Sequence, residues 1–465
     1  RWETRDMSRL HIVNPATGEP VGDAPDHSVE ECLVAVERAH IMFPEWSATA
    51  PRQRGEVLRR AFELMIAEQE ELARLIVAEN GKVLADARAE VAYAAEFFRW
   101  FSEEAVRIDG DLRRAPNGQY WLAVTREPVG PALCITPWNF PAAMATRKIG
   151  PALAAGCTVV LKAAAETPLT AYRISEILVR AGLPEGVVTV VTPSSPGPAV
   201  EAMLASGKIR KLSFTGSTRV GSVLLKQAAD RIINCSMELG GNAPFVVCED
   251  ADIPAAVEGA MLAKMRNGGA ACTAANRFYV HRAVAGEFTG MLADRMSALR
   301  VGDGLADGTG VGPLVSAAQQ QRVASLVERA VTAGAKVLCG GRATPAPMHG
   351  YEPTVLVDVD AANPVLAEEI FGPVAPIVTV DDIEASMHLL NGVDHGLVSY
   401  VYTRDTGRGM RIASALESGM VGLNRGLVSD PAAPFGGVKQ SGIGREGAHE
   451  GLLEFCETKY VATQW

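Results

Sequence analysis

The spacing of hydrophobic and polar residues divides the first half of the chain into helical and strand-forming regions. Apolar residues alternate with charged faces at helical intervals over about 29–43 and 52–105, which is typical of amphipathic packing helices. Short apolar runs rich in β-branched residues follow at 132–136, 158–162, 187–191, 211–214 and 243–247. Helical segments such as 168–181 and 217–230 separate these runs. The alternation predicts an α/β fold with a parallel sheet covered by helices.

The second half of the chain repeats this pattern. Further strands are expected near 277–281, 336–339 and 398–402, so the sequence predicts a second α/β lobe. Two other strand-like segments, 120–127 and 458–463, flank the core regions and could pair as a simple edge hairpin. With 465 residues, the chain exceeds what one hydrophobic core usually serves, so two or three domains are expected.

Composition and charge narrow the class of protein. The chain is 48% hydrophobic and 21% charged, which is typical of a compact folded protein. Its formal net charge of −10 argues against nucleic acid or an anionic membrane as a partner. The eight cysteines show no C-x-x-C spacing, so we expect neither a metal site nor a disulfide scaffold. This cysteine usage favours a reducing cytoplasm, and the charged residues 1–6 lack the apolar core of a signal peptide.

Two segments contain a candidate nucleophile and a candidate base. The sequence Met-Glu-Leu-Gly-Gly-Asn at 237–242 includes Glu238, and Arg-Asn-Gly-Gly-Ala-Ala-Cys at 266–272 ends with Cys272. A thiolate is a strong nucleophile, and a carboxylate in a poorly hydrated cleft can take protons near neutral pH. An isolated pair of this kind, however, is more often a buried inert cysteine and a solvated glutamate.

Three further motifs occur in order along the chain: Pro-Trp-Asn-Phe-Pro at 137–141, Glu-Glu-Ile-Phe-Gly-Pro at 368–373 and Pro-Phe-Gly-Gly at 434–437. Together with the two segments above, they resemble the aldehyde dehydrogenase superfamily. The resemblance extends from Asn-Pro-Ala-Thr-Gly at 14–18 to the C-terminal segment. It implies an aldehyde dehydrogenase-like fold, with a Rossmann-like cofactor domain, an α/β catalytic domain and a small oligomerisation β-sheet.

The resemblance also implies domain boundaries. Residues 1–117 and 132–239 would form the dinucleotide-binding domain, and residues 240–440 the catalytic domain. Residues 118–131 and 455–465 would be oligomerisation strands, so a homodimer or homotetramer is expected.

By the same resemblance, Cys272 attacks an aldehyde to form a thiohemiacetal, which loses hydride to a nicotinamide ring and becomes a thioester. Glu238 then activates the water that hydrolyses the thioester. The side-chain amide of Asn139 and the backbone N–H of Cys272 would stabilise the oxyanion. The alternatives are that Asn139 caps a turn and that Glu238 is a structural carboxylate paired with a lysine.

The expected cofactor is NADP, with NAD as an alternative. The segment 212–217 predicts a strand-to-helix turn whose free N–H groups suit a pyrophosphate, although its glycines do not form G-x-G-x-x-G. The resemblance assigns Lys162 to the adenosine ribose, Glu369 to the nicotinamide ribose and Phe371 to the nicotinamide ring. The full set of expected cofactor residues is Trp138, Lys162, Ala165, Gly216, Ser217, Glu369 and Phe371.

Ala165 departs from the pattern of many NAD-preferring relatives, which have Glu at this position. A Glu would bond the ribose 2′-hydroxyl and repel a 2′-phosphate, so Ala165 removes an obstacle to NADP. A second departure is Ala270-Ala271 before the nucleophile, where relatives have polar residues.

Three residues predict the substrate class. Arg147, Arg266 and Ser429 resemble the succinate-semialdehyde dehydrogenase branch, where two arginines and a serine hold the distal carboxylate. Structural ion pairs are the alternative for both arginines, and Arg425 adds a cation that could favour other semialdehydes. We therefore expect oxidation of succinic semialdehyde or a close carboxylate-bearing aldehyde. The alternatives are broader activity on glutaric, aromatic or betaine aldehydes, and a non-catalytic scaffold of the same fold.

Overall fold

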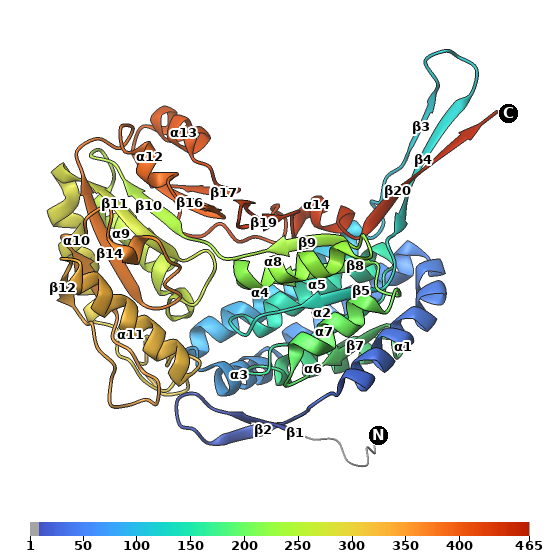
Figure 1. Ribbon diagram of the computed structural model, residues 1–465, viewed down its shortest axis with the longest axis horizontal. Helices are drawn as coiled ribbons and strands as arrows, with labels where there is room; N and C mark the ends of the chain where they lie inside the picture. Colours follow the sequence, from blue (N-terminus) through green and yellow to red (C-terminus); the bar gives the residue numbers. More distant parts are fainter. Residues whose placement is uncertain (1–8, 465) are drawn as a thin grey trace.

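The computed structural model describes residues 9–464, which form two α/β lobes and a narrow arm (Figure 1). The α/β fold expected from the alternating pattern is confirmed. The described part of the chain begins with a hairpin formed by β1 (Arg9–Val13) and β2 (Pro20–Pro25). In the described part of the chain, no helix is both long and apolar enough to cross a membrane.

The first lobe is built on a six-stranded sheet with the order β19-β9-β8-β5-β6-β7. Its strands are β5 (Ala132–Ile135), β6 (Val159–Lys162), β7 (Val188–Val191), β8 (Lys211–Thr215), β9 (Asn234–Glu238) and β19 (Gly442–Ile443). Only β19 runs antiparallel to its neighbour, and the other neighbouring strands pair in parallel. The helices between these strands are α5 (Pro141–Ala155), α6 (Leu169–Arg180), α7 (Pro196–Ala205) and α8 (Thr218–Ala229).

Four N-terminal helices complete this lobe: α1 (Val29–Ala48), α2 (Pro51–Ala67), α3 (Gln69–Asn80) and α4 (Leu84–Glu104). Helices α2 and α4 pack against α5, and their apolar faces form one continuous core with the sheet. The sequence pattern predicted packing helices in this region, and two of them form the layer against which α5 packs. Its position matters because α5 directly follows the Asn139 motif.

The second lobe contains a seven-stranded sheet with the order β12-β13-β14-β11-β10-β16-β17, in which only β12 is antiparallel. Its strands are β10 (Ala243–Val247), β11 (Ala275–His281), β12 (Lys336–Cys339), β13 (Thr354–Val357), β14 (Val374–Val380), β16 (Val398–Tyr402) and β17 (Met420–Leu423). The helices of the lobe are α9 (Ile253–Met265), α10 (Arg282–Ser297), α11 (Ala317–Thr332), α12 (Met387–Leu390) and α13 (Thr406–Ala415). A cluster of packed rings around Phe245 anchors the core.

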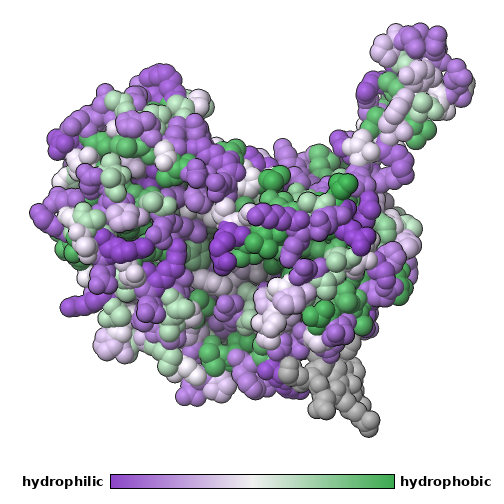
Figure 2. Space-filling model, viewed as in Figure 1, coloured by the Kyte–Doolittle hydropathy of each residue, from purple (hydrophilic) through white to green (hydrophobic). Residues whose placement is uncertain are grey.

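The arm is an antiparallel sheet that projects away from both lobes (Figure 1). It consists of β3 (Asp111–Arg114), β4 (Trp121–Pro128) and β20 (Cys456–Thr463), with β4 in the centre. Strands β4 and β20 match the two segments that the sequence predicts. Strand β3 was not predicted, because its sequence Asp-Leu-Arg-Arg is exposed throughout and carries no alternating apolar signal. Figure 2 shows polar and apolar residues mixed on the arm.

The two lobes meet where the chain passes from one sheet to the other. Strand β9 ends at Glu238, and β10 of the second sheet begins at Ala243, so only four residues separate the sheets. A Cβ atom on Gly241 would lie 2.3 Å from the backbone oxygen of Cys272, so this close approach requires glycine. Near the C-terminus, β19 returns to pair with β9, with Gly442 opposite Glu238. Short β15 (His395–Gly396), β18 (Val438–Lys439) and α14 (Ala448–Leu453) complete the described strands and α-helices.

Candidate active site

Cys272 lies in the loop between α9 and β11, at the junction of the lobes. Helix α9 ends at Met265, and the chain then reverses through Asn267, Gly268 and Gly269, whose φ angles are 54°, 58° and 79°. Gly269 is required here because a Cβ atom would lie 2.2 Å from the backbone oxygen of Gly372. The side chain of Cys272 remains partly exposed. Desolvation, followed by the charge of Glu238, raises the pKa of this thiol well above its usual range.

Glu238 occupies the last position of β9 and is buried beside Cys272. Neither of its carboxylate oxygens has a hydrogen-bond partner of normal geometry among the described residues. Burial, and then the charge of Glu446, raises the pKa of Glu238 to about 7, although Arg147, Lys148 and the Cys272 thiol act in the opposite direction. No lysine forms an ion pair with Glu238 in residues 9–464, in contrast to the structural alternative.

A buried charge cluster lies behind Glu238. Lys148 Nζ is 2.5 Å from Glu446 Oε1 and donates to Ser213 Oγ at 2.9 Å. Burial raises the pKa of Glu446, but Lys148 and Arg147 outweigh this effect and hold it below its usual value. Glu446 therefore carries a negative charge that disfavours ionisation of Glu238. Sequence reasoning missed Lys148 and Glu446, which lie 298 residues apart.

Asn139 is tied to the loop that carries Cys272. Its side-chain amide Nδ2 donates to the backbone oxygen of Ala270 at 3.0 Å, while its Oδ1 has no partner. The backbone oxygen of Asn139 accepts from Lys82 Nζ and from Asn267 Nδ2, each at 2.8 Å. Asn267 Nδ2 also donates to the Ala270 oxygen at 2.9 Å. An amide nitrogen carries two hydrogens, so one hydrogen on Asn139 Nδ2 remains for another acceptor.

A buried ion pair supports this arrangement from α4. Lys82 Nζ is 2.5 Å from Glu90 Oε2, and both side chains are almost fully buried. The other carboxylate oxygen of Glu90 accepts from the backbone N–H groups of Ala142 and Ala143, at 2.9 and 3.3 Å. Glu90 therefore satisfies free donors at the N-terminus of α5. No local signal marks either residue, because Lys82 and Glu90 are 8 positions apart and Glu90 and Ala142 are 52 positions apart.

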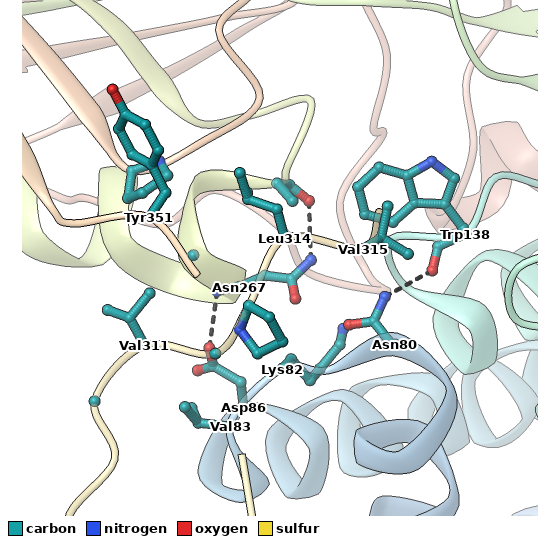
Figure 3. Close-up of a pocket in the computed structure, with 16 residues that line it drawn as sticks. Asn80, Lys82, Val83, Asp86, Trp138, Asn267, Val311, Leu314, Val315 and Tyr351 are labelled. Carbon is teal, nitrogen blue, oxygen red and sulfur yellow. Dashed lines mark hydrogen bonds between the residues drawn. The ribbon is translucent and has the colours of Figure 1, made fainter. Parts of the chain in front are cut away.

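A small cavity of about 20 Å³ lies beside Lys82, Asp86 and the loop of Asn267. Figure 3 shows Lys82 and Asp86 facing the loop of Asn267, with Trp138 at the opposite side. The backbone N–H of Asn267 donates to Asp86 Oδ2 at 2.8 Å (Figure 3). The cavity has room for about one water molecule. It is therefore too small for an aldehyde substrate and belongs to the support of the Asn267 loop.

The expected cofactor residues gather at the carboxyl ends of β6 and β8. Lys162 ends β6, and the exposed Ala165 follows it. Gly216 and Ser217 form the turn between β8 and α8, which confirms the strand-to-helix turn. Two groups of this turn are already used: the N–H of Gly216 donates to the oxygen of Glu238, and Ser217 Oγ accepts from Val220 N. The expectation of free N–H groups is therefore wrong for Gly216.

The remaining cofactor candidates come from the second lobe. Glu369 Oε1 accepts from the backbone N–H of Gly241 at 3.3 Å, and burial raises the pKa of Glu369 to about 7. Phe371 has a φ angle of 54°, and its ring meets Trp138 edge to face with centroids 5.3 Å apart. The structure thus brings Glu369, Phe371 and Trp138 from different lobes to the same junction.

A larger cavity of about 500 Å³ contains two of the three expected substrate residues, Arg266 and Ser429. The guanidinium of Arg266 lies 4.8 Å from the centre of the Phe140 ring. Within residues 9–464, Arg266 has neither an ion pair nor a hydrogen bond to its side chain. The alternative that Arg266 forms a structural ion pair therefore has no support in the described residues. Arg425 is exposed, and its Nε donates to the oxygen of Leu427.

Arg147 differs from Arg266, because it does not line this cavity. Its two terminal nitrogens donate to Glu446 Oε2 at 3.4 Å and to the Tyr93 hydroxyl at 2.6 Å. The guanidinium also lies 4.1 Å from the centre of the Phe435 ring. Arg147 thus forms the structural ion pair that was the alternative to substrate binding. Tyr93, to which Arg147 donates, lines the cavity.

Comparison with known proteins places these features in a family. The model of the aldehyde dehydrogenase family matches residues 2–461. A succinate-semialdehyde dehydrogenase of Paenarthrobacter nicotinovorans is 51% identical, over 93% of this chain and 96% of that protein. A glutarate-semialdehyde dehydrogenase of Pseudomonas putida is 47% identical, over 99% of this chain and 95% of that protein.

A solved structure of an NADP-dependent enzyme of Escherichia coli has a TM-score of 0.97 and 44% identity, covering 98% of this chain and 95% of that one. The order of motifs, the fold and these matches agree along almost the whole length. The chain belongs to the aldehyde dehydrogenase family.

Proposed function

We propose that this protein oxidises succinic semialdehyde, or a close carboxylate-bearing aldehyde, to the acid with NADP, and that it also accepts NAD. The observation that carries the proposal is the unpaired Arg266 guanidinium, which lines a cavity of about 500 Å³ together with Ser429. Two of the relatives named above act on dicarboxylic semialdehydes, which supports the same substrate class. A guanidinium fork and a hydroxyl suit a carboxylate.

The catalytic roles are assigned to Cys272, Glu238 and Asn139. In the free enzyme the thiol is protonated, because burial and the neighbouring carboxylate raise its pKa. Glu238 has no competing hydrogen-bond partner and a pKa of about 7, so it can take the thiol proton as sulfur attacks the aldehyde. The resulting oxyanion would be held by the second hydrogen of Asn139 Nδ2 and by the backbone N–H of Cys272.

Glu238 is proposed to act again when the thioester is hydrolysed. Its proton can pass to product or solvent, after which the ionised carboxylate takes a proton from the attacking water. Burial, together with the charge of Glu446, keeps the pKa of Glu238 at about 7, so both protonation states are accessible at neutral pH. The charge cluster with Lys148 would hold Glu446 ionised throughout.

The residues at the carboxyl ends of β6 and β8 fit a dinucleotide. Lys162 is partly buried and has no ion pair among the described residues, so its ammonium is available to a polar ligand. Ala165 places no carboxylate where a 2′-phosphate would approach, and we propose a preference for NADP on this basis. The nicotinamide would supply the acceptor for the hydride of the thiohemiacetal. Glu369 and Phe371 are proposed to position its ribose and ring.

The proposed roles of the domains follow the two sheets. We assign cofactor binding to residues 1–117 and 132–239, except β3 (Asp111–Arg114), which belongs to the arm. The thiol is assigned to residues 240–440, and the substrate cavity to that range together with residues of α4. Arg147 is proposed to add positive charge beside that cavity. The arm, which includes parts of 118–131 and 455–465, is proposed to join copies of the chain into a homodimer or homotetramer, because Leu112, Tyr460 and Val461 expose 57%, 52% and 46% of their area.

Initial rates of NAD(P)H formation with succinic semialdehyde, glutaric semialdehyde and butanal test the proposal. The semialdehydes should give kcat/KM values at least about a hundredfold above butanal, because the neutral aldehyde leaves the arginine without a partner. A preference for butanal would retain an aldehyde dehydrogenase but reject the carboxylate site. No turnover, even with aromatic and betaine aldehydes, would favour a non-catalytic scaffold. Replacement of Arg266 with Ala should raise the KM of the semialdehyde alone.

A further inference from the structure

Tyr93 lies between the buried Arg147 and the substrate cavity. It projects from α4, and it lines the cavity together with Arg266 and Ser429. Its ring packs edge to face on Phe97, with centroids 5.0 Å apart. Phe97 is buried in the main core of the first lobe, so the Tyr93 ring is held by a fixed neighbour.

The hydrogen bonding of Tyr93 has a defined direction. Arg147 donates to the Tyr93 oxygen at 2.6 Å, and a guanidinium N–H can only donate. The Tyr93 oxygen must therefore accept, which leaves its own hydrogen to be donated elsewhere. Within residues 9–464, no acceptor receives that hydrogen, because the bond from Arg147 is the one hydrogen bond that the hydroxyl makes.

The charge behind Tyr93 strengthens this donor. Accepting from a guanidinium draws electron density from the phenol oxygen and polarises its O–H bond, as in other charge-assisted chains of hydrogen bonds. Arg147 itself is buried and held on its other side by Glu446. The positive charge of Arg147 can thus act on the cavity through Tyr93 while its guanidinium stays in place.

A carboxylate offers about four acceptor sites, and Arg266 with Ser429 would fill at most three of them. We propose that Tyr93 is a further specificity residue, whose hydroxyl, polarised by Arg147, donates to the distal carboxylate of the substrate. This inference rests on the proposed function. In this proposal Arg147 acts by holding and polarising the Tyr93 hydroxyl, and α4 becomes part of the substrate site.

The test compares Tyr93→Phe with the unchanged protein, using succinic semialdehyde and butanal at saturating NADP. Removal of one hydrogen bond to a charged group should raise the KM of the semialdehyde by about tenfold to a hundredfold, with kcat retained. The KM of butanal should not change, because butanal has no carboxylate. Tyr172→Phe is the matched control, since Tyr172 also shares its hydroxyl in one bond, to Thr192 at 2.8 Å, but lies away from the cavity.

The outcomes separate the two hypotheses. If the unchanged protein does not favour the semialdehyde over butanal, the proposed function fails, and the role of Tyr93 fails with it. If the unchanged protein favours the semialdehyde and Tyr93→Phe keeps the same preference, only the role of Tyr93 is rejected. An equal fall in kcat for both aldehydes would also reject it, because Tyr93 would then act through the cluster of Arg147 and Glu446. Thermal melting of both variants verifies that they are folded.

Discussion

Glu238 and Cys272 are two acidic groups in one poorly hydrated site. The charge of Glu238 makes ionisation of the Cys272 thiol harder, whereas the thiol favours the ionised form of Glu238. The thiol has its pKa raised well above the usual range, while Glu238 titrates near 7. At neutral pH Glu238 is therefore the group whose protonation state changes easily. Neither oxygen of Glu238 is occupied by a hydrogen-bond donor among the described residues, which leaves it free for the proposed proton exchange with Cys272.

Turnover should accordingly rise with pH through about 7, because Glu238 must be ionised to accept a proton. Replacing Glu238 with Gln should remove this dependence and lower steady-state kcat by about a hundredfold or more. If hydrolysis of the thioester becomes limiting, rapid mixing should show a burst of NADPH close to one equivalent per Cys272. A variant with normal kcat and an unchanged pH profile would exclude Glu238 as the base.

Ala165 gives a second prediction at the scale of one residue. In Ala165→Glu, the new carboxylate should repel the 2′-phosphate, and kcat/KM for NADP should fall by more than about tenfold while NAD is used at least as well. Parallel initial-rate series with both cofactors measure the ratio, and Ala165→Gln serves as the neutral control. The assignment is contradicted if the unchanged protein already favours NAD by more than about tenfold.

Among the elements, α5 connects the most parts of the site. Asn139 lies two residues before its first residue, Pro141, and Arg147 and Lys148 lie in its second and third turns. Its first turn is fixed by Glu90 of α4, and Glu90 is neutralised by Lys82, which also holds the backbone oxygen of Asn139. Helices α4 and α5 therefore set the position of the proposed oxyanion donor together.

This predicts a linked loss of stability and turnover in Lys82→Met. The change leaves Glu90 as an unpaired buried charge, so the free energy of unfolding should fall by about 3–5 kcal/mol. Its kcat should also fall for charged and neutral aldehydes alike, because Asn139 loses one of its two backbone tethers. Urea denaturation and steady-state kinetics provide the measurements.

The double variant Lys82→Met with Glu90→Gln is the matched control. It removes the unpaired charge but keeps an acceptor for the first turn of α5, so much of the stability should return while kcat stays low. If Lys82→Met is as stable as the unchanged protein, the buried pair does not have the role assigned to it.

At the scale of the whole molecule, the site exists because two sheets are joined by only four residues beside it. The first lobe contributes Asn139 and Glu238, and the second contributes Cys272, Arg266 and Glu369. The arm lies far from this junction (Figure 1) and exposes apolar side chains that a single chain does not cover.

Charged residues on the arm should therefore weaken self-association. We expect the double variant Leu112→Asp with Tyr460→Asp to shift the protein toward monomer in light scattering after size exclusion. Met410→Asp, on an equally exposed position of α13, should leave the mass unchanged. An unaltered mass for the arm variant, or a monomeric unchanged protein, would reject the role of the arm.

Much of this molecule follows from local patterns in the chain. The alternation of apolar strands and amphipathic helices predicts the α/β lobes, because burial on a helix-covered sheet requires it. The motifs around Cys272, Glu238 and Asn139 carry the resemblance that the family matches confirm. Strand β3 escapes prediction because it buries no apolar face in a single chain.

The tertiary structure decided which groups are free and which are engaged. Arg147 and Arg266 look alike in the sequence, yet the first is bound to Glu446 and Tyr93 and the second is unpaired in the described chain. The same holds for Glu238, whose pKa is raised first by burial and then by the charge of Glu446 from the C-terminal region. The pKa values and the bonding partners of these groups depend on burial and on distances between residues that are far apart in the sequence. No local pattern encodes those quantities, whereas residue type and periodicity are sufficient for the two α/β lobes.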